Sequence, residues 1–143
     1  MGKVFFFNAD IKAKVSDKTS IKKLIGLLFK NEKASFDRVN YIFCSDKYLL
    51  EINREFLEHD TLTDIITFPL STSGLPISAE IYVSIKRVQE NAKLFNVSYE
   101  NELLRVIIHG ALHLCGYNDK KKVDKLHMRN KEDFYIKNFK RFT

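Results

Sequence analysis

The chain has 143 residues, a formal net charge of +6 and a sequence pI near 9.3. That length suits a single domain, residues 1–143, with its own core, and no apolar run is long enough to cross a bilayer. The first ten residues are too briefly apolar for a secretory signal, and two cysteines are too few for a disulfide framework. We therefore expect a cytoplasmic protein with two buried thiols, Cys44 and Cys115, and no membrane association.

The excess positive charge lies near the C-terminal end of the sequence. Residues 120–143 contain nine basic and three acidic residues, whereas the other 119 residues contain 15 of each kind. Such a segment suits a polyanionic partner, although a solvated lysine-rich helix has the same composition. The charge alone leaves both interpretations open.

The first half of the chain shows two strand patterns and two helix patterns. Residues 4–9 form a short apolar run typical of a strand, and residues 17–31 place apolar side chains at helical spacing opposite lysines. Residues 38–44 have the aromatic and β-branched content of a second strand, which is followed by a helix ending near Leu57. The expected buried stripe of this second helix consists of Leu49, Ile52 and Phe56.

Two further strands and a helix are expected in the middle of the chain. Residues 63–69 run from a polar loop into a short β-rich segment that Pro69 ends, and residues 78–84 alternate as a strand. We expect these two segments to lie side by side in one sheet. Ser84 is placed to cap the helix that follows. The expected apolar positions of that helix are Ile85, Val88, Ala92 and Phe95.

The last two expected elements are helices of opposite character. Ser98 is placed to cap a helix that is apolar almost all round between Leu103 and Leu114, which is typical of a central, buried helix. Residues 123–139 are expected to form a basic helix. Its expected docking residues are Val123, Leu126, Phe134 and Tyr135. Together these elements predict an α+β domain with a mixed sheet of about four strands packed with helices.

Two histidines are the polar exceptions on the predicted buried helix. His109 and His113 are four residues apart, which stacks their side chains on one helix face with about 5–6 Å between Cβ atoms, close enough to bind one ion. Gly116 follows where a helix favours a left-handed residue, so the chain can turn back and bring Asp119 to the same ion. The pattern HxxxHxxGxxD therefore predicts a metal site with three protein ligands and an open position, as in catalytic zinc sites.

The same ligand spacing occurs in the metzincin peptidases, whose motif is HExxHxxGxxH. Those enzymes place a glutamate directly after the first histidine as the general base, and this chain has Gly110 there. The motif therefore predicts a catalytic metal site, but the missing glutamate disfavours a peptidase.

With these residues laid out, the chain resembles the bacterial YbeY-type endoribonucleases over nearly its whole length. The family signature HGxLHLxGYDH corresponds to residues 109–119, which read HGALHLCGYND. A second family element, Thr-Asp followed by a short apolar strand ending in Phe-Pro, corresponds to residues 63–69. A third element, Gly-Asp-Ile, corresponds loosely to residues 79–81, which read AEI.

The resemblance implies an endoribonuclease that depends on one Zn²⁺ ion and prefers single-stranded RNA. It implies a role in maturation of small-subunit ribosomal RNA and in ribosome quality control, with the ribosome or its small subunit as a partner in the bacterial cytoplasm. It also implies a four-stranded α+β fold with the metal at the mouth of a cleft.

The chain departs from the family pattern at two places. The third ligand is usually histidine, and Asp119 stands there. Its negative charge would leave the bound ion with net charge +1, so we expect a less acidic bound water and wider metal tolerance. The family also often carries an arginine where this chain has Leu57. Arg54, one helical turn earlier, or His59 is the alternative partner for the phosphate charge.

The mechanistic hypothesis is metal-assisted cleavage of an RNA phosphodiester. Zinc held by His109, His113 and Asp119 would polarise a phosphoryl oxygen or lower the pKa of its water towards about 7. No glutamate follows the first ligand, so either the general base comes from elsewhere or the metal hydroxide acts directly. Asp64 and His59 are candidates for nearby support, although Asp64 also suits a loop cap. The alternatives are a metallopeptidase or small-molecule metallohydrolase, and a non-catalytic ribosome-binding factor with structural zinc. Structural zinc normally has four protein ligands, which disfavours the last alternative.

Overall fold

The computed structural model describes residues 2–57 and 63–142, with side chains up to residue 140. Within these residues a four-stranded sheet has the order β1-β2-β4-β3. Its strands are β1 (Lys3–Asn8), β2 (Phe36–Cys44), β3 (Ile65–Pro69) and β4 (Ile77–Ser84). β2 is parallel to both β1 and β4, whereas β3 is antiparallel to β4. The predicted mixed sheet is confirmed, including the pairing of the two segments expected to lie side by side.

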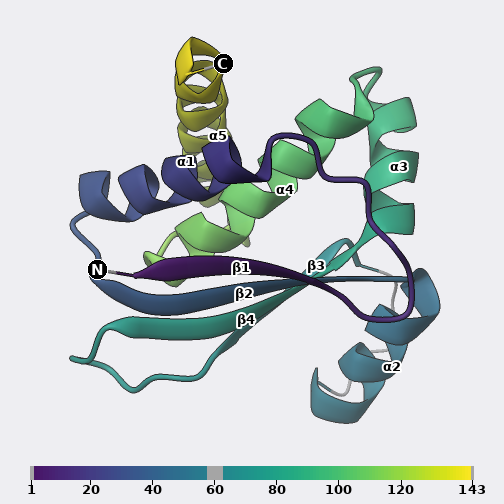
Figure 1. Cartoon of the computed structure of the whole chain (residues 1–143), viewed down its shortest axis with the longest axis horizontal. Coiled ribbons are helices and arrows are strands. Elements are labelled where there is room, and N and C mark those ends of the chain that lie inside the picture. The colour runs from purple at the N-terminus through teal and green to yellow at the C-terminus, as the bar shows by residue number, and fades with distance from the viewer. Residues whose placement is uncertain (1, 58–62, 143) are drawn as a thin grey trace.

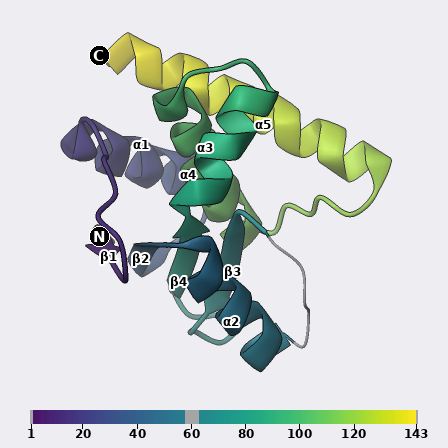
Figure 2. The same cartoon turned by 90° about the vertical axis from the view of Figure 1, so that its right-hand side faces the viewer.

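Helices cover the two faces of the sheet unequally (Figure 1; Figure 2). In the described part of the chain, four helices lie on one face, and α2 (Asp46–Leu57) packs on the other, against β3 and β4. The four are α1 (Lys18–Asn31), α3 (Ile85–Leu94), α4 (Tyr99–Leu114) and α5 (Lys122–Phe142). This is the predicted α+β architecture. None of the described helices is long and apolar enough to span a membrane.

α4 is the central helix that the sequence predicts. Ser98 accepts a hydrogen bond from the backbone N–H of Asn101 at its N-terminus, as expected of a cap. Seven of its apolar side chains are buried between the sheet and the neighbouring helices. The Tyr41 hydroxyl, on β2, donates a hydrogen bond of 2.8 Å to the carbonyl oxygen of Ile107. Packing and this bond together fix the position of α4 on the sheet.

Gly110 marks the closest approach between α4 and the sheet. A Cβ atom added there would lie 2.9 Å from Ile65 Cδ1 and 3.1 Å from Ile81 Cδ1. The position after His109 therefore faces β3 and β4, where a larger side chain would separate the helix from the strands. This packing gives a physical reason for glycine at the position that a metzincin peptidase gives to its glutamate.

We expect Gly110→Ala to lower the free energy of unfolding by about 1–2 kcal/mol, because overpacking outweighs the gain in helix propensity. Gly26, on α1, is a matched control, since an added Cβ would have no neighbour within 4 Å. Gly26→Ala should therefore raise the free energy of unfolding by about 0.5–1 kcal/mol. Urea denaturation followed by circular dichroism measures both changes. Equal stabilisation by the two substitutions would contradict the packing argument.

The buried stripes predicted for α2 and α3 are each wrong at their last residue, which is exposed. Phe56 on α2 is 63% exposed, and Phe95 is 52% exposed. α3 ends at Leu94, so Phe95 is its C-cap residue and no longer follows the helical face. Both aromatic rings therefore remain accessible to a ligand.

α5 docks through a different face from the one predicted. Val123, Leu126 and Phe134 are exposed, and of the expected docking residues only Tyr135 is buried. The face that packs on the domain consists of Met128, Glu132, Tyr135 and Ile136. The prediction from apolar spacing missed this face because the face contains a carboxylate. Burying a charge is costly unless partners from other elements offset the cost, and the spacing does not show such partners.

The two cysteines are free thiols, and neither belongs to the described metal-ligand cluster. Cys44 is buried, as predicted, whereas Cys115 is only partly buried and packs against the main core. Burial raises the pKa of Cys115 to about 12. Its thiol is therefore protonated at neutral pH, which suits packing better than metal ligation.

Candidate metal centre

Three side chains from the motif converge on one point. Asp119 Oδ2 lies 3.2 Å from His109 Nε2 and 3.5 Å from His113 Nε2. The ligand atoms of all three lie within 4.8 Å of one another. A tetrahedron with metal–ligand bonds of 2.0–2.1 Å has edges of about 3.3–3.4 Å, so this spacing suits a zinc-sized ion. Gly116, with φ +100°, makes the expected left-handed bend that returns Asp119 to the two rings.

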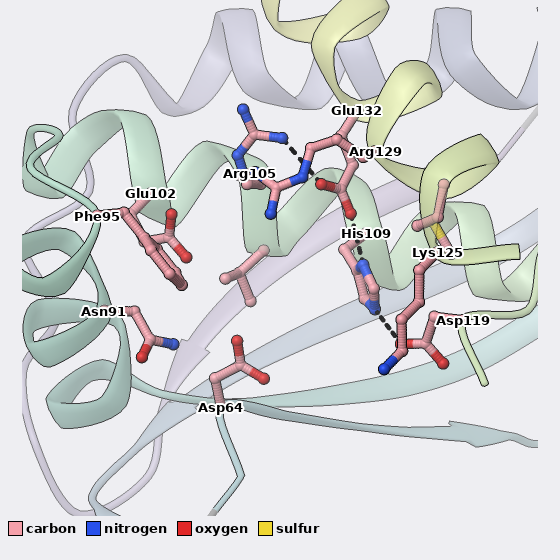
Figure 3. A pocket seen from close by; sticks show the side chains of 12 residues that line it. Asp64, Asn91, Phe95, Glu102, Arg105, His109, Asp119, Lys125, Arg129 and Glu132 are labelled. Carbon is pink, nitrogen blue, oxygen red and sulfur yellow. Dashed lines mark hydrogen bonds and ion pairs between the residues drawn. The ribbon is translucent and has the colours of Figure 1, made fainter. Parts of the chain in front are cut away.

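The other nitrogen of each imidazole is already engaged. His109 Nδ1 donates a hydrogen bond of 2.6 Å to Glu132 Oε2, and His113 Nδ1 donates one of 2.9 Å to the carbonyl oxygen of Tyr117. Both rings are therefore oriented with Nε2 facing Asp119 (Figure 3 shows the His109 contacts). Metal-ligating histidines are usually held through their second nitrogen in this way, so the donor set fits a metal ion.

Glu132 on α5 is the anchor of His109, and sequence reasoning missed it. Its side chain is 6% exposed, and its Oε1 accepts a hydrogen bond of 2.9 Å from Arg105. Arg105 also donates to Asp133 at 2.8 Å. The spacing of the sequence could have placed Glu132 correctly. It lies four residues from both Met128 and Ile136, so the three side chains share one face of the helix.

Carboxylates surround the inner histidine. Burial alone lowers the pKa of His109, but the hydrogen bond with Glu132 and the charges of Glu132, Asp119 and Asp64 raise it above its usual value. The surroundings of His109 therefore favour a positive charge, whether it is a proton or a metal ion.

The centre opens into a cleft of about 330 Å³, which is lined by side chains of α3, α4 and α5 and by Asp64. Asp64 lies just before β3, so the structure brings this predicted residue to the same cleft as His109 and Asp119. Burial raises the pKa of Asp64, and the charge of His109 opposes that change. Asp64 is therefore a carboxylate with raised proton affinity beside the candidate metal ligands.

The cleft contains cations that sequence reasoning did not single out. Arg105, Lys125 and Arg129 line it, the last two from the basic helix α5. Arg54 and Leu57 lie on α2, on the opposite face of the sheet, and neither lines the cleft. His59 lies outside the described residues. Among the described residues, the positive charge available to a phosphate in this cleft comes from α4 and α5.

The bend after α4 is tied to the end of α1 by Glu32. Its carboxylate accepts hydrogen bonds of 2.5 Å from the hydroxyls of Tyr117 and Tyr135, and one of 3.2 Å from Lys131 Nζ. Burial alone raises the pKa of Glu32, but these three donors outweigh it and hold the pKa below its usual value. A charged Glu32 therefore stabilises the segment that carries Asp119.

This depressed pKa predicts a pH-dependent contribution to stability. The contribution is present above the unfolded pKa of about 4.3 and is lost as the pH falls through the lower folded pKa. We expect Glu32→Gln to lower the free energy of unfolding by about 1–3 kcal/mol at pH 7, and this difference to shrink below about pH 4. Urea titrations at several pH values measure it, with Glu55→Gln, on the exposed face of α2, as the control. A difference that stays constant with pH would contradict this role.

Comparisons with known proteins agree with the motif and the fold. The family model described as Endoribonuclease YbeY matches residues 6–140. The chain is 50% identical over 133 residues to Endoribonuclease YbeY of Flavobacterium psychrophilum, with 93% of this chain and 94% of that protein covered. It is 47% identical over 133 residues to the protein of the same name from Flavobacterium johnsoniae, with 93% and 95% covered.

A solved structure extends this likeness to three dimensions. The solution structure of TM1509 from Thermotoga maritima matches with a TM-score of 0.62 and 31% sequence identity, over 95% of this chain and 88% of that one. The family match spans both the strand β3 and the motif at residues 109–119. This chain therefore belongs to the YbeY endoribonuclease family.

Proposed function

We propose that this protein is a zinc-dependent endoribonuclease that cleaves single-stranded RNA during maturation of small-subunit ribosomal RNA. Its place is the bacterial cytoplasm, its partner is the ribosome or its small subunit, and it also serves ribosome quality control. Residues 1–143 act as one domain. The observation that carries the proposal is the convergence of His109, His113 and Asp119 beside a cleft that contains three cationic side chains, in a chain of this family.

One zinc ion would be held by His109, His113 and Asp119. Two imidazole nitrogens and a carboxylate oxygen suit zinc, and three protein ligands are typical of its catalytic sites. When bound, zinc supplies Lewis-acid chemistry toward a phosphoryl oxygen and toward water. Glu132 and the Tyr117 carbonyl hold the two rings in orientation, so the ligands need little rearrangement.

Asp64 is the proposed proton acceptor. It lines the cleft with His109, and burial brings its pKa closer to the pH at which the protein works. A carboxylate of this kind accepts a proton from an attacking hydroxyl group more readily than a fully solvated one does. In a metzincin peptidase a glutamate at the position of Gly110 would accept the proton. Here Gly110 packs on Ile65 and Ile81, which leaves no room for a glutamate side chain.

Lys125 and Arg129 are the proposed contacts to RNA phosphates. Both line the cleft from α5, and neither forms a salt bridge within the described part of the chain. We expect Lys125→Ala and Arg129→Ala each to reduce the slope of log K against log salt by about 0.7 for single-stranded RNA. Fluorescence anisotropy between about 50 and 200 mM salt measures the slope. Lys137→Ala, an exposed residue of α5 outside the cleft, is the control; an equal change there would point to diffuse attraction by the helix.

The direct test compares substrates with and without a chelator. Single-stranded RNA, duplex RNA and an unstructured peptide are incubated with purified protein whose metal content is measured by mass spectrometry. We expect cleavage of single-stranded RNA only, and its loss on chelation. Peptide cleavage would support the metallopeptidase alternative. Metal-loaded protein that binds small subunits but cuts no RNA would support the non-catalytic ribosome-binding factor.

A further inference from the structure

The cleft extends beyond the metal centre to a second group of side chains. Asn91 and Phe95 come from the end of α3, and Glu102 comes from the first turn of α4. All three line the same cleft as His109. Figure 3 shows them on one side of the cleft, with His109 and Asp119 on the other. A ligand that fills the cleft would therefore contact both groups.

Glu102 is a largely buried residue whose carboxylate has no donor from the described part of the protein. The residue is only 4% exposed, and its side chain has no hydrogen bond or salt bridge among the described residues. Burial raises the pKa of Glu102, while the charge of Arg105 opposes that change. No fully buried side-chain oxygen lacks a hydrogen-bond partner in the described part of the chain, so the Glu102 oxygens are accessible from the cleft that the residue lines. A ligand that brings N–H groups into the cleft would supply the missing donors.

Its neighbours provide the other contacts of a base-binding site. The Asn91 side chain is half-buried, and its amide has no hydrogen-bond partner in the part of the chain that the structure describes. The Phe95 ring is 52% exposed. Proteins bind unpaired bases by stacking them on aromatic rings and by hydrogen bonding to their edges. Phe95, Asn91 and Glu102 together offer a ring, an amide and a carboxylate within one cleft.

We propose that Phe95, Asn91 and Glu102 form a subsite for one unpaired guanine of the RNA substrate. The Phe95 ring stacks on the base, and the Glu102 carboxylate accepts hydrogen bonds from its N1–H and N2–H groups. The Asn91 amide donates to its O6 atom. Guanine fits because its pairing edge presents two adjacent N–H donors, and an ionised carboxylate can only accept. The subsite rests on the proposed nuclease function and adds a base preference to it.

The cations in the cleft favour RNA over a protein side chain. A protein arginine also presents paired N–H donors, but it brings no phosphate for Arg105, Lys125 and Arg129, which line the cleft together with four carboxylates. Glu102 and His109 are seven residues apart on one face of α4, about 10 Å along the helix axis. This distance is comparable with the span of a nucleotide from base edge to phosphate. A guanine in the subsite would therefore place a neighbouring phosphodiester close to the metal centre.

The cleavage test uses single-stranded RNA with one guanosine in a uridine tract, and the same RNA with inosine or adenosine at that position. Inosine lacks the N2 amino group, so it removes one of the two donors. We expect wild type to prefer guanosine by about tenfold or more and Glu102→Gln to lose this preference. Phe95→Ala should slow cleavage of all three RNAs by about tenfold, because an aromatic ring stacks on any base. Glu100→Gln and Leu94→Ala change exposed neighbours on the same helices and should leave the preference unchanged.

Binding provides a second readout that does not need cleavage. Fluorescence anisotropy measures the affinity of the three RNAs for metal-free His113→Ala protein and for wild type in chelator, and circular dichroism confirms that each variant is folded. A guanosine preference that persists there and disappears with Glu102→Gln supports the subsite, even if wild type cuts no RNA and the proposed function fails. Cleavage without base preference, or a preference kept by Glu102→Gln, overturns the subsite and leaves the nuclease standing. Binding of an arginine-rich peptide that depends on Glu102, without any base preference, also overturns it.

Discussion

His113→Ala should abolish metal binding and RNA cleavage together. The substitution leaves His109 and Asp119 as the only two of the three converging ligands. A catalytic metal contributes several kcal/mol of transition-state stabilisation, and each 1.4 kcal/mol is about a factor of ten in rate. We therefore expect the cleavage rate to fall by at least about a thousandfold. Metal content by mass spectrometry and initial rates on single-stranded RNA measure the two losses.

His127→Ala is the matched control for this experiment. His127 is an exposed histidine of α5 whose ring contacts Tyr117, and it does not belong to the converging ligands. The control variant should retain its zinc and its activity. Full nuclease activity in folded, metal-free His113→Ala protein would show that the reaction does not use this metal centre.

Glu132→Gln should weaken zinc binding by about 10–100-fold, because the carboxylate that orients and polarises His109 is lost. Activity at limiting zinc should fall in parallel. The same change removes a buried charge partner of Arg105, so we expect the free energy of unfolding to fall by about 1–3 kcal/mol. Competition with a chromophoric chelator measures the zinc affinity, and urea denaturation measures the stability.

Asp133→Asn separates these two effects. Asp133 also accepts a hydrogen bond from Arg105, at 2.8 Å, but its side chain is 57% exposed, and Glu132 is the residue that contacts His109. Asp133→Asn should therefore leave the zinc affinity close to that of wild type. If both substitutions weakened zinc binding equally, Glu132 would act through Arg105 and the packing of α5, not through His109.

The convergence of the candidate ligands is largely a local property of the sequence. The spacing of His109 and His113 places both rings on one face of any regular helix, and Gly116 supplies the left-handed residue that turns the chain back to Asp119. The two serine caps and the apolar helix that follows the second of them are likewise short-range features, and the structure confirms them. Such features are predictable because the interacting groups lie within a few residues of one another.

The rest of the cleft depends on contacts between distant segments. Glu132, on α5, lies 23 residues after His109. Its burial is stable only because Arg105 and His109, both on α4, donate hydrogen bonds to its carboxylate. A hydrophobic pattern treats such a carboxylate as solvent-exposed, which is why the predicted face of α5 was wrong. Phe95 was misplaced for a related reason: α3 ends one residue earlier, so its ring faces the cleft instead of the core.

The sequence by itself determined the strand and helix order, the buried central helix and the set of candidate metal ligands, because periodicity, capping and helical spacing act over short distances. Only the tertiary structure decided which charged groups surround those ligands. Three features require segments far apart in the chain to pack together. They are the hydrogen bond between Glu132 and His109, the hydrogen bond from Tyr117 to Glu32, and the position of Glu102 in the cleft. The energy that makes a buried carboxylate stable comes from such partners, and no local pattern contains them.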